Sequence, residues 1–155
     1  MSPESGLSEI IAVASDHGGF DLKVLLAEHL SSRGFEVLDL GTHSSDAVDY
    51  PDIAETLVEA LRSGRAKRGI LMCGTGIGVS IAANRHSEIR AALCHDMTTA
   101  RLARQHNDAN VLVMGGRIIG VEIARDSVDV FLATAFEGGR HARRVGKLGA
   151  RAPAC

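Results

Sequence analysis

The chain has 155 residues, of which 45% are hydrophobic, and this is enough for one domain with a sizeable apolar core. A formal net charge of −2, with one Tyr and no Trp, argues against the basic field and the aromatic stacking platforms that nucleic-acid binding requires. Three widely spaced cysteines form no disulfide framework and no apolar stretch reaches the length of a membrane span, so we expect a cytoplasmic protein with free thiols and no membrane partner.

The first half of the chain predicts two strands and two helices. Apolar runs at residues 10–15 and 35–40 are typical of buried strands. Between them, regularly spaced apolar residues predict a helix that ends at a glycine: Leu22, Leu26, Leu30 and Gly34. A second helix is expected to begin near Pro51, because proline is favoured in the first helical turn and apolar residues follow on one face, namely Ile53, Leu57 and Leu61.

The second half continues this alternation. Apolar runs at residues 69–73, 90–94 and 110–115 predict three more strands. Further helices are expected after the glycines that follow residue 73, after a capping Asp96, over the stripe of Val121, Ala124, Val128 and Leu132, and after the Glu-Gly-Gly of residues 137–139. The pattern predicts a single α/β domain over 1–155, with a five-stranded, mostly parallel sheet, helices on both faces, and peripheral tails at 1–8 and 149–155.

Three glycines in "MCGTGIG", residues 72–78, follow the third strand, where ligands bind in such sheets. A dinucleotide fingerprint needs a glycine where Val79 stands, although Asp96 lies about twenty residues after Gly76, where such a site carries an acid. A Walker loop is excluded because no Gly-Lys-Ser/Thr follows. We favour a loop whose backbone amides hold an anion, either a phosphate or an oxyanion that forms during a reaction.

Cys73 stands directly before this loop, at a predicted helix N-terminus, where the thiolate form is favoured. Such a sulfur can act as a nucleophile, or as a base that moves a proton on a carbon next to a carbonyl. The alternative is that Cys73 is a small buried hydrophobe, as cysteines at strand ends commonly are. Neither Cys94 nor Cys155 precedes a comparable loop, and neither is given a role.

Polar residues at other strand and helix ends add candidates. They are Asp16 and His17 after the first strand; Tyr50 directly before Pro51; His106 and Asn107 at the end of a later helix; and Arg117, Arg140 and Arg144 after glycines. Arginines suit phosphate recognition, and a tyrosine can hydrogen-bond a sugar hydroxyl. Structural alternatives remain. They are a helix cap for Asp16, packing with the phenol at the surface for Tyr50, a helix end favoured by the dipole for His106, and a solvated basic face for the arginines.

Five segments together resemble the type B ribose-5-phosphate isomerases, whose superfamily includes the galactose-6-phosphate isomerases. The segments are "SDHGG", "VLDLGTHSSDAVDYPDIA", "CGTGIGVSIAANR", "RQHNDANVLVMGGRIIG" and "FEGGRHARRV", in this order between about residues 10 and 147. The resemblance implies a Rossmann-like α/β fold and an aldose–ketose isomerisation of a sugar phosphate through a cis-enediolate. It implies neither a metal nor a nucleotide cofactor.

By position, the resemblance also implies individual roles. Cys73 is the base that moves the proton between two sugar carbons, and Thr75 is its hydroxyl partner. The backbone amides that hold the enediolate are those of residues 74–78, namely Gly74, Thr75, Gly76, Ile77 and Gly78. Asp16 binds ring and hydroxyl groups, His106 assists ring opening, and Asn107 binds substrate beside it. The phosphate ligands are His17, Arg117, Arg140 and Arg144, whereas Glu137 receives no role.

The resemblance further implies a homodimer whose sites draw residues from both subunits, and it leaves open whether dimers pair into tetramers. The expected reaction interconverts ribose 5-phosphate and ribulose 5-phosphate. The first alternative is another sugar phosphate: allose 6-phosphate, galactose 6-phosphate or a tetrose phosphate. The second is a sugar-phosphate-binding protein without catalysis. A base and an acid placed across the sugar, Cys73 and His106, favour an enzyme over a binding protein.

Overall fold

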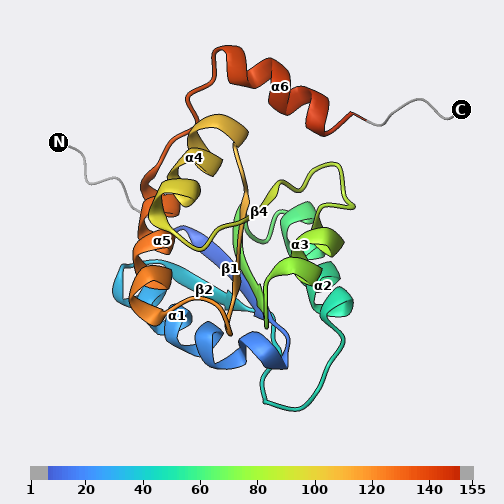
Figure 1. Ribbon diagram of the computed structural model, residues 1–155, viewed down its shortest axis with the longest axis vertical. Helices are drawn as coiled ribbons and strands as arrows, with labels where there is room; N and C mark the ends of the chain where they lie inside the picture. The colour runs from blue at the N-terminus through green and yellow to red at the C-terminus, as the bar shows by residue number, and fades with distance from the viewer. Residues whose placement is uncertain (1–6, 151–155) are drawn as a thin grey trace, which may run out of the picture.

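A computed structural model describes residues 7–150, in which five strands form one sheet (Figure 1). The strands are β1 (Ile10–Ser15), β2 (Glu36–Asp39), β3 (Arg68–Cys73), β4 (Ala91–Leu93) and β5 (Val111–Gly115). Their order is β2-β1-β3-β5-β4, and every neighbouring pair is parallel. The predicted α/β sheet is therefore confirmed, and it is wholly rather than mostly parallel. The predicted tails fall largely outside the described residues, and Cys155 lies there too.

Two strands are two residues shorter than predicted, and β2 shows the reason. The amide of Phe35, expected to open the strand, donates to the carbonyl of Leu30 at 3.1 Å and so completes the end of the preceding helix. β4 likewise covers three residues, Ala91–Leu93, where five were predicted. The sheet still buries near-continuous apolar runs in β1, β3 and β5, as parallel strands covered on both faces require.

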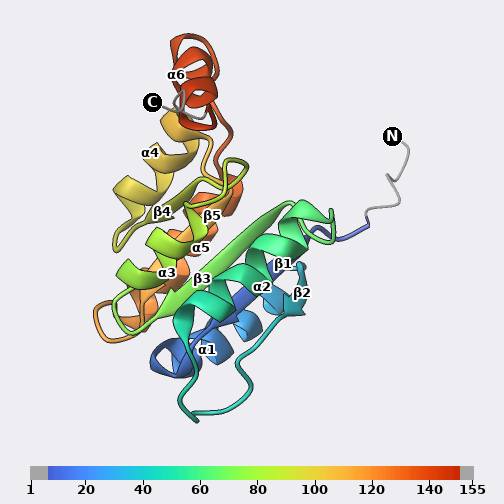
Figure 2. The same cartoon turned by 90° about the vertical axis from the view of Figure 1, so that its right-hand side faces the viewer.

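Helices cover both faces of the sheet. They are α1 (Phe20–Ser32), α2 (Tyr50–Arg62), α3 (Ile77–Ala83), α4 (Met97–Asn107), α5 (Val121–Ala133) and α6 (Arg140–Leu148), with a 3₁₀ turn, η1 (His17–Gly19), before α1. Buried residues of α1, α4 and α5 share one apolar cluster, and those of α2 and α3 share another. Figure 2 shows α2 and α3 in front of the sheet, with α1 and α5 behind it. By contrast, α6 stands away from the sheet and contacts α4.

Local sequence signals set several of these boundaries. The side chain of Asp96 accepts from the amide of Thr99 at 2.6 Å and caps α4, as predicted. Gly34 has φ +88°, a left-handed conformation that ends the turn after α1. Pro51 is the second residue of α2, where its missing N–H removes no helical bond.

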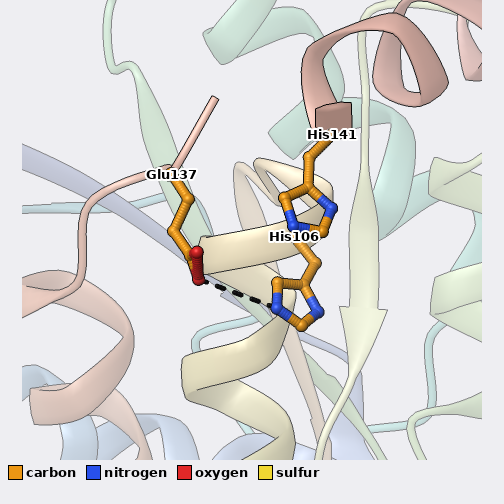
Figure 3. A group of neighbouring side chains, drawn as sticks. All are labelled: His106, Glu137 and His141. Carbon is orange, nitrogen blue, oxygen red and sulfur yellow. Dashed lines mark ion pairs between the residues drawn. The ribbon is translucent and has the colours of Figure 1, made fainter. Parts of the chain in front are cut away.

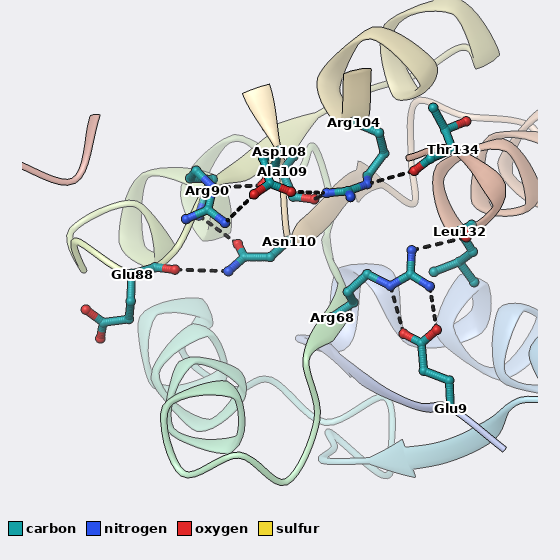
Figure 4. A network of polar contacts seen from close by, with 10 residues as sticks. All are labelled: Glu9, Arg68, Glu88, Arg90, Arg104, Asp108, Ala109, Asn110, Leu132 and Thr134. Atoms are coloured by element: carbon teal, nitrogen blue, oxygen red, sulfur yellow. Dashed lines mark hydrogen bonds and ion pairs between the residues drawn. The ribbon is translucent and has the colours of Figure 1, made fainter. Parts of the chain in front are cut away.

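Arginines close the amino-terminal edge of the sheet (Figure 4). Arg68 binds both carboxylate oxygens of Glu9 and also donates to the carbonyl of Leu132. Arg90 donates to the carbonyl of Asp108 at 2.7 Å. Arg68 and Arg90 thus join the beginnings of strands to the ends of helices, so these two arginines have a structural role at the amino-terminal edge of the sheet. Among the described residues no helix is both long and apolar enough to cross a membrane.

Candidate active site

The carboxyl ends of β1, β3 and β5 meet around a pocket of about 230 Å³. Its lining residues are Asp16, His17, Gly18, Tyr50, Cys73, Gly74, Thr75, Gly78 and Arg117. In a parallel α/β sheet the carboxyl edge is the place where ligands bind. Six predicted polar or thiol candidates, distant in sequence, are therefore brought to one cavity. Gly18 lines it as well, and the adjacent pair of glycines after β1 was the sequence signal for it.

Cys73 is the last residue of β3 and is 5% exposed, yet its side chain faces the loop that lines the pocket. The amide of Gly76 donates to Cys73 Sγ at 3.1 Å. Gly76 has φ +79°, and a Cβ there would stand 2.5 Å from Leu93 and 2.9 Å from the carbonyl carbon of Met114. Only glycine fits this turn, and the turn aims an N–H at the sulfur, which stabilises negative charge on it.

The loop amides are not all equivalent. The amide of Gly76 is engaged with sulfur, and the amide of Ile77 donates to Thr75 Oγ1 at 3.2 Å. The Ile77 side chain is 53% exposed and lies outside the pocket lining. In this conformation two of the five amides expected to hold an enediolate therefore make bonds within the loop.

Asp16 combines the two roles that the sequence left open. Its Oδ1 accepts from the amide of Gly18 at 2.9 Å and caps η1, and the residue also lines the pocket at 7% exposure. His17 Nδ1 accepts from the amide of Val48 at 3.2 Å. This bond implies that the ring proton is on Nε2, a tautomer inferred from the hydrogen-bond pattern. His17 can then donate to a ligand oxygen from Nε2.

Tyr50 and Arg117 complete the walls of the pocket. A Cβ on Gly78 would lie 2.6 Å from the ring of Tyr50, so the glycine lets this ring lie against the start of α3. The amide of Arg117 donates to the carbonyl of Gly74 at 2.9 Å, and its Nε would be 3.4 Å from a Cβ on Gly74. A guanidinium is therefore held against the glycine loop, where an anion would bind.

The other candidates lie elsewhere in the same chain. His106 and Asn107 end α4, and Arg140 and Arg144 lie on α6; none of them lines this pocket. The reason is that α4 begins near the carboxyl edge and returns toward the amino edge over 11 residues, a span of about 16 Å. In Figure 1, α6 and the loop between β2 and α2 lie at opposite ends of the molecule.

At this second location His106, Glu137 and His141 form a cluster (Figure 3). Their potential ligand atoms all lie within 4.8 Å of one another, the one such group among the residues that the structure describes. The two imidazole rings, however, are stacked at an interplanar angle of 11° with centroids 4.3 Å apart. Imidazole lone pairs lie in the ring plane, so stacked rings do not converge on one ion. The cluster as arranged is a stacked pair with a neighbouring carboxylate.

His141 is the buried member of this pair, at 7% exposure. Burial lowers the pKa of His141, and the positive charges of His106, Arg140 and Arg144 lower it further, whereas Glu137 acts in the opposite direction. Sequence reasoning gave this histidine no role. The available signal was the Glu-Gly-Gly-Arg-His run itself, which ends in a histidine beside the two arginines.

The remaining described cysteine is unconnected with either cluster. Cys94 is 3% exposed, and burial raises its pKa. A raised pKa keeps the thiol protonated near neutral pH, which agrees with the expectation that Cys94 has no chemical role.

Known proteins match this chain over most of its length. The family model described as Ribose/Galactose Isomerase matches residues 11–148. Ribose-5-phosphate isomerase B of Escherichia coli is 50% identical over 135 residues, which are 87% of this chain and 91% of the relative. A D-erythrulose-4-phosphate isomerase of Pectobacterium atrosepticum is 42% identical over 90% of this chain and 92% of the relative.

A crystal structure of a ribose 5-phosphate isomerase from Thermotoga maritima superposes with a TM-score of 0.89 at 54% identity. The match covers 91% of this chain and 97% of that one. The Rossmann-like α/β fold expected from the five sequence segments is therefore confirmed by a solved relative. On the family match and on these identities, the chain belongs to the Ribose/Galactose Isomerase family.

Proposed function

We propose that this protein interconverts ribose 5-phosphate and ribulose 5-phosphate through a cis-enediolate, with Cys73 as the base. The observation that carries the proposal is the Gly76 amide on Cys73 Sγ, 3.1 Å away, in a pocket that also holds Asp16 and Arg117. Two relatives that are named ribose-5-phosphate isomerases match nearly the whole chain, and they support the same reaction.

The reaction moves one proton between adjacent carbons, and each step needs a stated group. The Cys73 thiolate removes the proton from C2 of the open-chain aldose, which leaves an enediolate and a thiol. The hydroxyl proton on O2 must also pass to O1, and we expect the Thr75 hydroxyl to relay it. The thiol then returns its proton to C1, which gives the ketose and restores the thiolate. As negative charge leaves sulfur for the enediolate oxygens, we expect the Thr75 hydroxyl and the loop amides that are not bonded within the loop to stabilise it.

We infer that a complete site needs two copies of the chain, because His106 and Cys73 lie at opposite edges of one sheet. Apolar side chains of α3, β4 and the start of α4 are exposed near the glycine loop: Ile77 (53%), Ile81 (56%), Leu93 (38%) and Met97 (48%). A two-fold dimer over this surface would bury them twice and bring one copy's α4 end and α6 toward the other's pocket. His106 would then assist ring opening, with Asn107 and the α6 arginines binding substrate.

An isomerase assay across sugar lengths tests the proposal. Aldose and ketose phosphates with four, five and six carbons are supplied to the purified protein, and both directions are followed by NMR. We expect the highest kcat/KM with ribose 5-phosphate. The Pectobacterium relative, a D-erythrulose-4-phosphate isomerase, makes a tetrose phosphate the first alternative substrate. A preference for a tetrose phosphate or for a hexose 6-phosphate would change the substrate but not the reaction class. Tight binding of sugar phosphates without interconversion would instead identify a binding protein. The cytoplasmic location stays a prediction.

A further inference from the structure

Three elements bring His106, Glu137 and His141 together: the last turn of α4, the loop after α5 and the first turn of α6 (Figure 3). The rings of His106 and His141 stack with centroids 4.3 Å apart. Glu137 Oε1 lies 3.7 Å from His106 Nε2. The proposed function uses His106 in ring opening but gives no role to the other two residues.

The surrounding contacts fix this arrangement. Arg104 joins the end of α4 to the end of α5, because it donates to the carbonyl of Thr134 at 3.1 Å and to Asp108 Oδ1 at 2.9 Å (Figure 4). The amide of Glu137 donates to the carbonyl of Gln105 at 3.1 Å, which attaches the loop to the turn before His106. One backbone hydrogen bond and the Arg104 side chain thus hold the backbone of Glu137 next to the last turn of α4, which carries His106.

The charges around the stack distinguish its two rings. The titratable and charged groups facing His141 are His106 from α4, Glu137 from the loop, and Arg140 and Arg144 from its own helix. Burial and the three cationic neighbours lower the pKa of His141, so this ring is neutral near pH 7. Two stacked cations would repel each other. His106 is the more exposed ring, at 39%, and it also faces the Glu137 carboxylate.

We propose that His141 and Glu137 are positioning residues for His106 during ring opening. The neutral ring of His141 fixes the plane of His106, and the carboxylate of Glu137 orients its Nε2 and stabilises the imidazolium. The inference rests on the proposed function, because an acid for ring opening is needed only if the substrate is a cyclic sugar phosphate.

The proton balance of the step is simple. His106 gives its proton to the ring oxygen as the bond between that oxygen and the anomeric carbon breaks. The anomeric hydroxyl loses its proton to water and becomes the aldehyde oxygen. His106 then takes a proton back from water, so that no net charge is transferred. The imidazolium that Glu137 stabilises is the form that donates.

Four variants separate stacking, charge and bulk. His141→Phe keeps a stacked aromatic ring that cannot titrate, and His141→Ala removes the ring. Glu137→Gln removes the charge and keeps the shape. Glu122→Gln, on α5 and 87% exposed at its side chain, is the matched control for loss of a surface carboxylate. Thermal unfolding and circular dichroism establish that each variant is folded.

Two rates are measured on each variant in the full-length protein. The first is conversion of ribose 5-phosphate, which must open its ring. The second is solvent deuterium uptake at C1 of ribulose 5-phosphate, which has no ring to open because its C5 hydroxyl carries the phosphate. We expect His141→Ala and Glu137→Gln to slow the first rate about tenfold, a fraction of what a general acid supplies, and to leave the second within about twofold. His141→Phe should restore most of the first rate.

The outcomes are distinguishable. Equal loss of both rates in His141→Ala and Glu137→Gln, or no loss of either, would overturn the positioning role. Failure of His141→Phe to restore conversion would show that this ring acts as an acid itself and would also overturn it. If the wild-type protein shows neither conversion nor exchange, the proposed function fails, and the inference fails with it.

Discussion

The backbone of Gly18 packs directly against that of Gly74: a Cβ on Gly18 would stand 2.9 Å from the Gly74 nitrogen and 3.0 Å from its Cα. Gly116 lies as closely on the other side, with a virtual Cβ 2.7 Å from the carbonyl oxygen of Gly18. The loops after β1, β3 and β5 therefore approach one another closely enough at these glycines for their backbone atoms to touch. This contact fixes how closely the three loops approach one another beside the pocket that Asp16 and Cys73 line.

Replacing Gly18 by alanine should force these loops apart. Because the obstructing atoms are backbone, the added methyl cannot be accommodated by a side-chain rotation, and overpacking of this kind costs about 1–3 kcal/mol. We expect Gly18→Ala to lower both the melting temperature and kcat. Gly120→Ala is the control, since a Cβ there has no atom within 4 Å, and it should change unfolding free energy by less than about 0.5 kcal/mol. Equal behaviour of the two variants would contradict the contact.

Mixing two inactive variants should restore activity if the site is shared between copies. Cys73→Ala and His106→Ala each lack one half of every site in their own homodimers. In a mixed dimer one of the two sites receives both intact residues, so random exchange should give about a quarter of wild-type activity. The measurement is turnover after unfolding and refolding the variants together. Activity that stays at the level of the separate variants would place both residues in a single-chain site.

Arg140 is expected to bind the substrate phosphate. A hydrogen bond to a charged group contributes about 1.5–3 kcal/mol, so Arg140→Ala should raise KM about 10- to 100-fold with a smaller effect on kcat. Arg143→Ala provides the control, because Arg143 is exposed on the same helix and is assigned no role. Initial rates over a range of ribose 5-phosphate concentrations decide the question. An unchanged KM would remove Arg140 from the phosphate site.

Asp39 should stabilise the fold through Lys23, whose side chain is only 1% exposed and whose Nζ lies 2.6 Å from Asp39 Oδ1. Although burial by itself raises the pKa of Asp39, hydrogen bonds from Lys23 and the Gly41 amide outweigh it and hold the pKa below its usual 3.8. This stabilisation is present above pH 3.8 and is lost as pH falls through the lowered value. Asp39→Asn leaves the buried ammonium without a carboxylate and should cost about 1–3 kcal/mol near pH 7, a range reduced for the part-exposed carboxylate.

Urea unfolding between pH 3 and pH 7 measures this effect, with Asp126→Asn, an exposed carboxylate on α5, as the control. The difference in unfolding free energy between wild type and Asp39→Asn should shrink toward acid pH, while the control stays close to wild type. A difference that is the same at every pH would show that the ion pair is not its source.

Local patterns predicted the fold because each strand or helix is signalled by a short run of neighbouring residues, either by the spacing of its apolar residues or by a capping residue. The leucines at 22, 26 and 30 lie on one buried helix face, and Asp96 caps its helix as its position suggested. Lys23 was not predicted to be buried. A lysine on an amphipathic helix is expected to reach solvent, and its partner Asp39 lies 16 residues away on a neighbouring strand.

The site was predictable in its parts but not in its arrangement. The glycine loop after β3 and the residues after β1 could be assigned to one edge of the sheet, because parallel strands end together. The distance of His106 from that edge depends on the direction and length of α4, and its stacking on His141 depends on the loop over residues 134–139. These are relationships between segments about thirty residues apart, and no local window contains them.

The most direct test of the central claim is the rate of proton transfer by Cys73→Ala, read as solvent deuterium uptake at C1 of ribulose 5-phosphate, with the dissociation constant of the ketose measured in parallel. Removal of the only proposed base should lower the exchange rate by at least about a hundredfold and leave the dissociation constant within a few-fold of wild type. Exchange within tenfold of wild type, at saturating ketose, would contradict the assignment of Cys73 as the base.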